Sequence, residues 1–355
     1  DYAFKNCALT EITLPADIQG IGNYAFSGCN DDIATEQGNA LYIGNKDNLY
    51  TVLYKAIDKT LESCTINANT KYIASEAFSG CKALTSITIP EGVKTIGAKA
   101  FFNCSALTEI VIPDSVTYIG AEAFSGCSAL ASATLGNGLK AIDYKLFYKC
   151  TSLTEITLPS GVTAIGTEAF SGCTALQSVA MLGKVTEIPS KAFSGCAALT
   201  TVTVQEGLTA IGDQAFYNCK ALIGLNNLDK VSAIGNSAFS GCSELVTIDS
   251  LTNVKTIATN AFYNCAKLTS VGALTKVESI GVNAFQGCKS IKSLIIANNI
   301  TFIGMTAFSG WTAAQSITFT VNTGKGSTWN SMWNYSCKAD IIWATAEESS
   351  ATTEE

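Results

Sequence analysis

The sequence is organised by a phenylalanine that returns every 23 residues. Early copies stand at Phe4 and Phe26, and a later series then runs without interruption. Its members are Phe78, Phe101, Phe124, Phe147, Phe170, Phe193, Phe216, Phe239, Phe262, Phe285 and Phe308. A period of this length is typical of solenoids, in which each unit is too small to bury its apolar residues alone and does so against its neighbours. We therefore predict one stack of coils over residues 1–320 and not several separate globular domains.

Each unit also carries a short alternating segment. In LTEITLP, Leu153 is followed at spacings of three and five by Ile156 and Leu158. Alternate residues of a strand point to the same side, so these side chains are predicted to face inward. A further stretch, VTAIG, supplies Val162 and Ile165 as inward candidates. The segment predicts short parallel strands, one above another in successive coils.

The phrase EAFSGC occurs three times, at 76–81, 122–127 and 168–173. Four residues before each phenylalanine of the series stands mostly glycine, but Pro189 also occurs there, and proline cannot adopt a positive φ. This position suits the start of a helical turn. Two residues after the phenylalanine stands glycine or asparagine, as at a helix end, with Lys149 as the exception. We therefore predict a short helical turn with a structural role and not a repeated catalytic phrase.

Ten of the 14 cysteines lie one per unit. They are Cys81, Cys104, Cys127, Cys150, Cys173, Cys196, Cys219, Cys242, Cys265 and Cys288, and the next copy is Trp311. Zinc sites need clustered ligands, which this spacing does not provide. Occasional disulfides and a metal site stay as alternatives, but the spacing favours a column of buried free thiols. Cys337 lies outside the column and is either buried or reactive.

The period is broken between Phe26 and Phe78, which are 52 residues apart. The segment ALYIGNKDNLYTVLY at 40–54 predicts a β-hairpin within a unit spanning about 38–60. Tyr42, Tyr50 and Tyr54 are candidates for an exposed aromatic cluster that binds a partner. The alternative is that these tyrosines cover the core where the turn phrase is missing.

The repeat columns fade near the end of the chain. Residues 321–345, which carry Trp329, Trp333 and Trp343, are predicted to seal the last coil as a C-terminal cap. Residues 346–355 are polar and acidic and are predicted to form a flexible tail.

Composition excludes several functions. The chain has no histidine, no arginine and a net charge of −7, which argues against nucleic-acid binding and against histidine-dependent triads. We expect no catalytic residues, no cofactor and no metal site. The acidic segment CNDDIATE at 29–36 has three closely spaced carboxylates that could hold calcium, but it lacks the spaced ligands and the glycine of an EF-hand loop, so we interpret it as a solvated loop. No apolar run is long enough to span a membrane.

The outward positions of the strands form a stripe of small, weakly polar side chains. Its threonines are Thr88, Thr134, Thr157 and Thr203. Such a surface can bind an extended peptide or a glycan, and these four residues are candidate partner contacts. The alternative is that threonine is simply a good strand former on a solvated face.

The motif L-x-x-I-x-[IL]-P-x-x-V-x-x-I-G-x-x-A-F-x-x-C, best seen at 153–173, resembles the BspA-like leucine-rich repeats of bacterial surface proteins. The resemblance covers about residues 1–320 and implies an α/β repeat solenoid, right-handed and gently curved. It further implies a secreted or cell-surface protein without shared catalytic residues. Adhesion to a host matrix or microbial surface protein is the first expectation, and polysaccharide binding or a structural spacer are the alternatives. We expect a monomer, and any signal peptide is expected upstream of Asp1.

Overall fold

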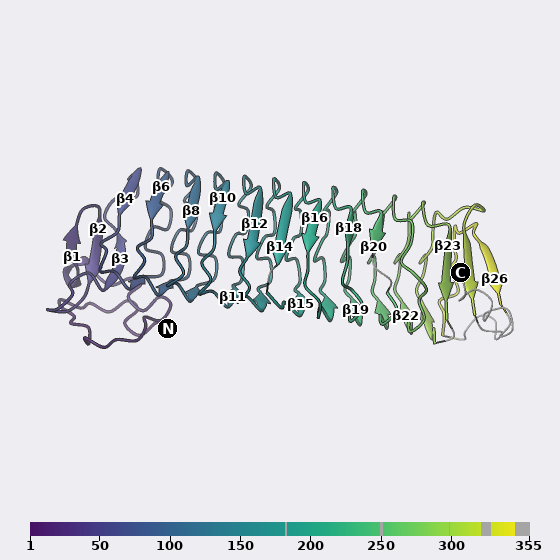
Figure 1. The fold of residues 1–355 in the computed structure, drawn as a ribbon, viewed down its shortest axis with the longest axis horizontal. Helices are drawn as coiled ribbons and strands as arrows, with labels where there is room; N and C mark the ends of the chain where they lie inside the picture. The colour runs from purple at the N-terminus through teal and green to yellow at the C-terminus, as the bar shows by residue number, and fades with distance from the viewer. Residues whose placement is uncertain (182, 249–250, 298, 321–327, 345–355) are drawn as a thin grey trace. The chain divides into compact units, whose positions relative to one another are not determined.

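The computed structural model describes residues 1–181, 183–248, 251–297, 299–320 and 328–344. The chain divides into two compact units, Asp1–Gly183 and Lys184–Glu355. Each unit is a stack of short coils with parallel strands, so the predicted parallel-strand solenoid is confirmed (Figure 1).

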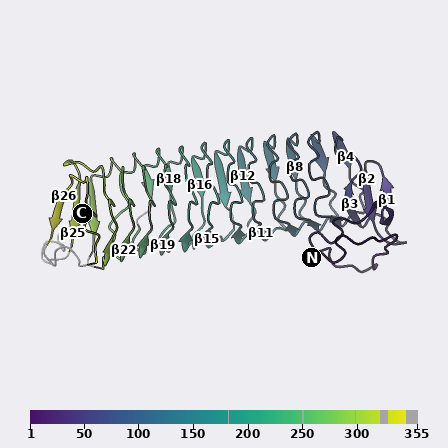
Figure 2. The same cartoon turned by 180° about the vertical axis from the view of Figure 1, so that it is seen from behind.

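The first unit contains two rows of strands. In both views the first row, with β4, β8 and β12, runs along the upper part of the coils, and the second, with β11, runs along their lower edge (Figures 1 and 2). The first row presents one outward face, which we call the strand face. The first row consists of β4 (Ser63–Thr65), β6 (Ser86–Thr88), β8 (Glu109–Val111), β10 (Ser132–Thr134), β12 (Glu155–Leu158) and β14 (Ser178–Met181). The second row consists of β5 (Tyr72–Ile73), β7 (Thr95–Ile96), β9 (Tyr118–Ile119), β11 (Ala141–Ile142) and β13 (Ala164–Ile165). Paired strands are parallel, and the register shifts by one 23-residue repeat, as in Ser63 opposite Ser86.

The second unit repeats this arrangement. Its first row consists of β16 (Thr201–Thr203), β18 (Gly224–Leu225), β20 (Thr247–Ile248), β23 (Ser293–Ile296), β25 (Ser316–Phe319) and β26 (Asp340–Trp343). Its second row consists of β15 (Glu187–Ile188), β17 (Ala210–Ile211), β19 (Ala233–Ile234), β21 (Thr256–Ile257), β22 (Ser279–Ile280) and β24 (Phe302–Ile303). All six strands of the second row form one parallel sheet.

The phenylalanine column forms the centre of both cores. In the first unit the Phe78 and Phe101 rings stack with centroids 5.2 Å apart, and in the second the Phe285 and Phe308 rings stack at 5.8 Å. All four side chains are fully buried. Ring pairs of this kind contribute roughly 0.5–1.5 kcal/mol each beyond the burial of their area, so the column binds each coil to the next.

The predicted helical turns are wrong. Within the described residues the only helical segment is one 3₁₀ turn, η1 (Asp31–Ile33). The phrase at 76–81 is instead a series of β-turns, because Glu76 and Gly80 hold left-handed φ angles of 64° and 78°. The Ser79 N–H donates to the Glu76 carbonyl, and the Cys81 N–H donates to the Phe78 carbonyl, as in consecutive turns. A left-handed residue cannot continue an α-helix.

Backbone conformation does not explain why glycine precedes most of these turns. Its φ is not positive, as the occurrence of Pro189 in this column predicted. A Cβ added at Gly97 would lie 2.4 Å from the Ser75 amide nitrogen of the preceding coil. Glycine here therefore permits the close approach of two coils.

All 14 cysteines are free, and the column from Cys81 to Cys288 is buried, as predicted. The sulfur of a column cysteine donates to the phenylalanine carbonyl of the coil before it, as Cys127 does to Phe101 at 3.1 Å. Burial raises the pKa of the Cys127 thiol to about 12. Cys337 is half-buried, and burial also raises its pKa.

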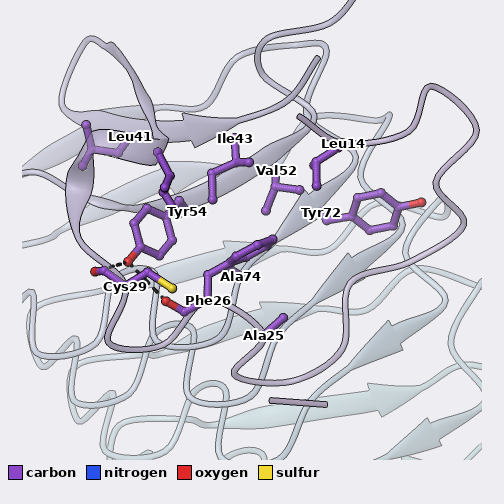
Figure 3. Packing of buried hydrophobic residues seen from close by; sticks show 11 residues of the cluster. Leu14, Ala25, Phe26, Cys29, Leu41, Ile43, Val52, Tyr54, Tyr72 and Ala74 are labelled. Atoms are coloured by element: carbon purple, nitrogen blue, oxygen red, sulfur yellow. Dashed lines mark hydrogen bonds between the residues drawn. The ribbon is translucent and has the colours of Figure 1, made fainter. Parts of the chain in front are cut away.

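The predicted hairpin is confirmed. Strands β2 (Ala40–Ile43) and β3 (Val52–Ala56) pair antiparallel, β1 (Thr35–Gln37) extends the pair, and β3 joins the second row by pairing parallel with β5. The hairpin packs its apolar residues, among them Ile43 and Val52, on the cluster around Phe26 (Figure 3).

The described part of the predicted cap, 328–344, continues the repeat with altered spacing. Trp333 packs edge-on against Phe308, the last phenylalanine of the column, with centroids 6.0 Å apart. The β26 strand pairs parallel with β25, and Trp343 stacks on Phe319 at 4.7 Å. Its capping role stays a prediction, and the predicted tail at 346–355 lies outside the described residues.

Candidate interaction surface

The three predicted hairpin tyrosines do not form an exposed cluster. Tyr42 is fully buried, Tyr54 is 6% exposed and Tyr50 is half-buried with its ring edge-on to Tyr42 at 5.5 Å. The exposure predicted for Tyr42 and Tyr54 is therefore wrong, because the hairpin turns their rings into the core. A partner contact of this group stays a prediction and concerns the exposed part of Tyr50.

In the hairpin unit, which lacks the turn phrase, Tyr54 supplies the hydrogen-bond donor that a column cysteine supplies in the regular coils. Its ring meets Phe26 edge-on at 6.3 Å, and its hydroxyl lies 3.2 Å from the Phe26 carbonyl and 2.9 Å from the Cys29 carbonyl (Figure 3). In the regular coils a thiol donates to the equivalent phenylalanine carbonyl. Burial, followed by the neighbouring Cys29 and Asp31, raises the pKa of Tyr54 to about 12, which keeps the hydroxyl protonated as a donor.

The four predicted threonines lie on the strand face and are exposed. Within the described part of the chain, the hydroxyls of Thr88, Thr134, Thr157 and Thr203 make no hydrogen bond to protein atoms. In contrast, Thr85, at the entry to β6, donates its hydroxyl to the Glu62 carbonyl of the preceding coil at 3.0 Å. The strand-face hydroxyls therefore remain available to a partner.

One open groove of about 370 Å³ lies on the strand face of the first unit, between β10 and β12. Ala133 stands there in the inward column that holds Ile110 and Ile156 in the neighbouring strands, and it is only half-buried where those isoleucines are buried. The missing side-chain volume opens the surface. The groove is lined by Ser132, Ala133, Thr134, Leu135, Asn137, Glu155, Ile156, Thr157 and Pro159.

A second groove, of about 460 Å³, lies on the strand face of the second unit between β16 and β18. Gly224 stands where the flanking strands carry Thr201 and Thr247, so the outward row lacks a side chain there. The groove is lined by Thr200, Thr201, Val202, Thr203, Val204, Ile223, Gly224, Leu225, Asn226, Asn227 and Thr247. None of these residues carries a charge.

Both grooves lie at a break in strand pairing. Among the strands that the structure describes, β10 is not paired with β12 and β16 is not paired with β18. The first-row strands β6 and β8 are also unpaired but line neither groove, so the small residues Ala133 and Gly224 are needed as well as the break. Main-chain N–H and C=O groups along such a break need water or a bound chain as partner. Thr134 and Thr157 thus share the first groove, Thr203 lies in the second, and Thr88 lines neither.

Sequence reasoning missed a second surface on the turn side of the first unit. The left-handed turn position alternates in sign through Glu76, Lys99, Glu122, Lys145 and Glu168. Lys99 lies 3.6 Å from Glu122, and Lys145 lies 3.4 Å from Glu168, which pairs the charges across successive coils. The alternation was visible in the sequence, but its meaning depends on the stacking of the turns.

The acidic segment at 29–36 is tied into the hairpin unit. Asp31 forms an ion pair of 2.5 Å with Lys55 on β3, and the Asn30 amide donates to Asp32. No group of three metal-ligating side chains occurs among the described residues. The same residues contain no helix long and apolar enough to cross a bilayer.

Comparison with known proteins places these features in a family. The family model for the BspA type leucine rich repeat region matches six copies, at residues 1–46, 53–177, 94–223 and 223–329. A solved leucine-rich repeat protein from Bacteroides ovatus is 28% identical, with a TM-score of 0.50, over 87% of this chain and 88% of that one. The pneumococcal vaccine antigen PcpA is 22% identical, with a TM-score of 0.52, over 95% of this chain and 89% of that one, which shows a similar fold. No curated protein matches the chain.

Proposed function

Because the chain belongs to the BspA-type leucine-rich repeat family, we propose that it is a non-enzymatic cell-surface or secreted protein whose strand face binds another macromolecule. The first candidate partner is a host matrix protein or a microbial surface protein. The expectation of export rests on the resemblance to surface proteins of this family.

The observation that supports this proposal best is the pair of grooves on the strand face. Their volumes lie within the range of binding sites, but both are open, so they suit segments of a larger partner better than an enclosed small molecule. The hydroxyls of Thr134, Thr157 and Thr203, which make no hydrogen bond to the described protein atoms, offer hydrogen bonds there. Exposed aliphatic side chains nearby, such as Val111 at 60% and Ile223 at 51%, offer apolar contact.

The proposal is non-enzymatic because the grooves lack the groups that most reactions need. Glu155 is the one ionisable side chain among the lining residues of both grooves. General acid–base chemistry and glycoside hydrolysis normally use two ionisable groups in one site. A surface of neutral hydrogen-bonding side chains is suited to recognition.

Biolayer interferometry of the purified chain against immobilised fibronectin, laminin, collagen and intact microbial cells tests the proposal. Thr203→Arg and Thr134→Arg place a bulky cation in each groove without disturbing the core. The matched control is Thr256→Arg, an exposed strand threonine of the second row. We expect the groove variants to weaken binding by about tenfold and the control to leave it unchanged. Equal binding by all variants, or no binding by the unaltered chain, contradicts the proposal.

A further inference from the structure

Among the turns of the phenylalanine series in the first unit, the turn at 143–150 departs most from the repeat. Where most turns read Gly-x-x-Ala-Phe-x-[Gly/Asn]-Cys, this turn reads Asp-Tyr-Lys-Leu-Phe-Tyr-Lys-Cys. Leu146 and Phe147 are fully buried and keep the core intact. The remaining departures therefore alter the surface alone.

These surface residues form one connected cluster with Tyr118 of the preceding coil. The Tyr118 hydroxyl donates to Asp143 Oδ2 at 3.3 Å, and Asp143 Oδ1 accepts the Tyr144 N–H at 2.6 Å. The ammonium of Lys145 lies 4.9 Å from the Tyr144 ring centroid and 5.1 Å from that of Tyr148. We call Tyr118, Asp143, Tyr144, Lys145, Tyr148 and Lys149 the tyrosine patch.

The patch presents aromatic rings to solvent beside polar groups. Tyr118 is 41% exposed and Tyr144 is 38% exposed, whereas the phenylalanines of the column from Phe78 to Phe308 are fully buried. Lys149 lies over the Tyr148 ring at 5.1 Å and holds a left-handed φ of 57°. The other turns of the phenylalanine series carry glycine or asparagine at this position, so the lysine is kept against an unfavourable backbone conformation.

The two lysines of the patch are matched by two carboxylates, Asp143 within it and Glu168 beside it. Lys145 lies 3.4 Å from Glu168. The Tyr144 hydroxyl and, after it, the Glu168 carboxylate raise the pKa of Lys145, so this ammonium stays charged. An anionic ligand would need a surplus of positive charge, and the net charge of −7 would repel it over longer distances.

Flat apolar rings, hydroxyls, a carboxylate acceptor and ammonium donors match the surface of a sugar. A saccharide has apolar C–H faces that fit against an aromatic ring, and hydroxyls that both donate and accept hydrogen bonds. A protein partner would be expected to insert an anchor into a hollow. The two strand-face grooves are lined by other residues, so the patch offers exposed rings without either of those hollows.

We propose that the tyrosine patch is a binding site for a neutral polysaccharide. The site lies on residues that the strand-face proposal does not use, so either proposal can fail without the other. Exposed tyrosine rings on which sugar rings can stack, together with one carboxylate and two ammonium groups, suit a hexose polymer that binds along the turns of the first unit.

Native affinity electrophoresis of the full chain tests this site. The gels contain laminarin, yeast mannan or xyloglucan as neutral polymers and polygalacturonate as the anionic one. We expect at least one neutral polymer to retard the chain. Tyr144→Ala and Tyr118→Ala should each weaken that retardation by about tenfold, as removal of one ring from a small contact does.

The matched control is Tyr217→Ala. Tyr217 occupies the same repeat position as Tyr148 and is 38% exposed, but it belongs to the second unit and is not a residue of the patch. The Tyr217→Ala variant should be retarded by the polymer as strongly as the unaltered chain, and so should the strand-face variant Thr203→Arg. Unchanged thermal melting of all variants shows that they are folded. The proposal would be overturned if no polymer retards the chain or if only polygalacturonate does. It would also be overturned if Tyr217→Ala loses as much retardation as Tyr144→Ala and Tyr118→Ala.

Discussion

The indole nitrogen of Trp311 donates a hydrogen bond to the Phe285 carbonyl at 3.0 Å. In the coil before it, the Cys288 thiol makes the equivalent bond to Phe262 at 3.1 Å. A tryptophan therefore replaces a cysteine in the column without loss of the hydrogen bond between coils. This position in the column therefore requires a buried hydrogen-bond donor to the carbonyl of the preceding coil, and it does not require the reactivity of a thiol.

Serine should consequently be tolerated inside the column and not outside it. In Cys127→Ser the hydroxyl can donate to the Phe101 carbonyl, and we expect a loss of less than about 1 kcal/mol in the free energy of unfolding. The matched control is Cys64→Ser. Cys64 is buried on β4 and makes no hydrogen bond within the described residues, so its serine should cost about 1–3 kcal/mol. Equal losses in urea unfolding would contradict this account of the column.

Tyr54→Phe should destabilise the hairpin unit by about 1–3 kcal/mol. The substitution keeps the ring against Phe26 but removes the hydroxyl that serves the Phe26 and Cys29 carbonyls. Tyr50→Phe is the control, because Tyr50 is half-buried and its hydroxyl makes no hydrogen bond among the described residues. Hydrogen exchange of the β2 and β3 amides measures the effect locally. Similar protection in both variants would show that the Tyr54 hydroxyl contributes nothing.

Stability should fall with rising pH above about 9. Burial raises the pKa of the Cys127 thiol from 9.0 to about 12 and also raises those of Cys150 and Cys219. The folded chain keeps protons that the unfolded chain releases, so the contribution is complete below about pH 9 and is lost progressively as pH rises toward the folded-state pKa.

Thermal melting between pH 6 and pH 10.5 measures this dependence. Cys127→Ser removes one titrating thiol, so between pH 9 and pH 10 it should lose about 1 kcal/mol less than the unaltered chain. A melting temperature that stays constant up to pH 10.5 would refute the assignment.

Much of the fold was predictable because the period of 23 places identical residues in register. Phe101, Cys127 and Ile156 could be assigned to the core from spacing alone, and all three are buried there. The hairpin followed from the alternation around Gly44. The resemblance to a known family rested on the same columns and is confirmed.

The turn was predicted wrongly because its deciding residue has no sequence signature. Glutamate, lysine, glutamine, serine, asparagine and threonine all occupy the left-handed position between the glycine and the phenylalanine, although none except asparagine favours that conformation. The two flanking signals were real, but they resemble the start and end of a helix. Stacking against the next coil, as when the Phe78 N–H donates to the Ala100 carbonyl, stabilises the turn instead.

The candidate surface was predictable only in part. The outward position of Thr134 and Thr157 followed from alternation. The groove between them did not, because it depends on the small Ala133 side chain at a break in strand pairing. The burial of Tyr42 and Tyr54 was likewise hidden, since a hairpin sequence does not show which of its faces the rest of the chain covers.

Lys149 offers the last prediction, because it is the one lysine at a turn position that elsewhere holds glycine or asparagine. Its φ of 57° matches those of Asn103 and Asn218 at the same position, so Lys149→Asn requires no change of backbone. Asparagine tolerates this conformation better than lysine, and relief of the strain should exceed the loss of the contact with the Tyr148 ring. We expect a gain of about 0.5 kcal/mol in the free energy of unfolding, measured with urea.

The control is Lys140→Asn, an exposed lysine whose φ is not positive, where asparagine should bring no gain. If Lys149→Asn is no more stable than the unaltered chain, the lysine is not strained. Its retention would then need no explanation from the tyrosine patch. A gain, in contrast, means that stability has been given up at this coil, which is the pattern expected of a surface kept for binding.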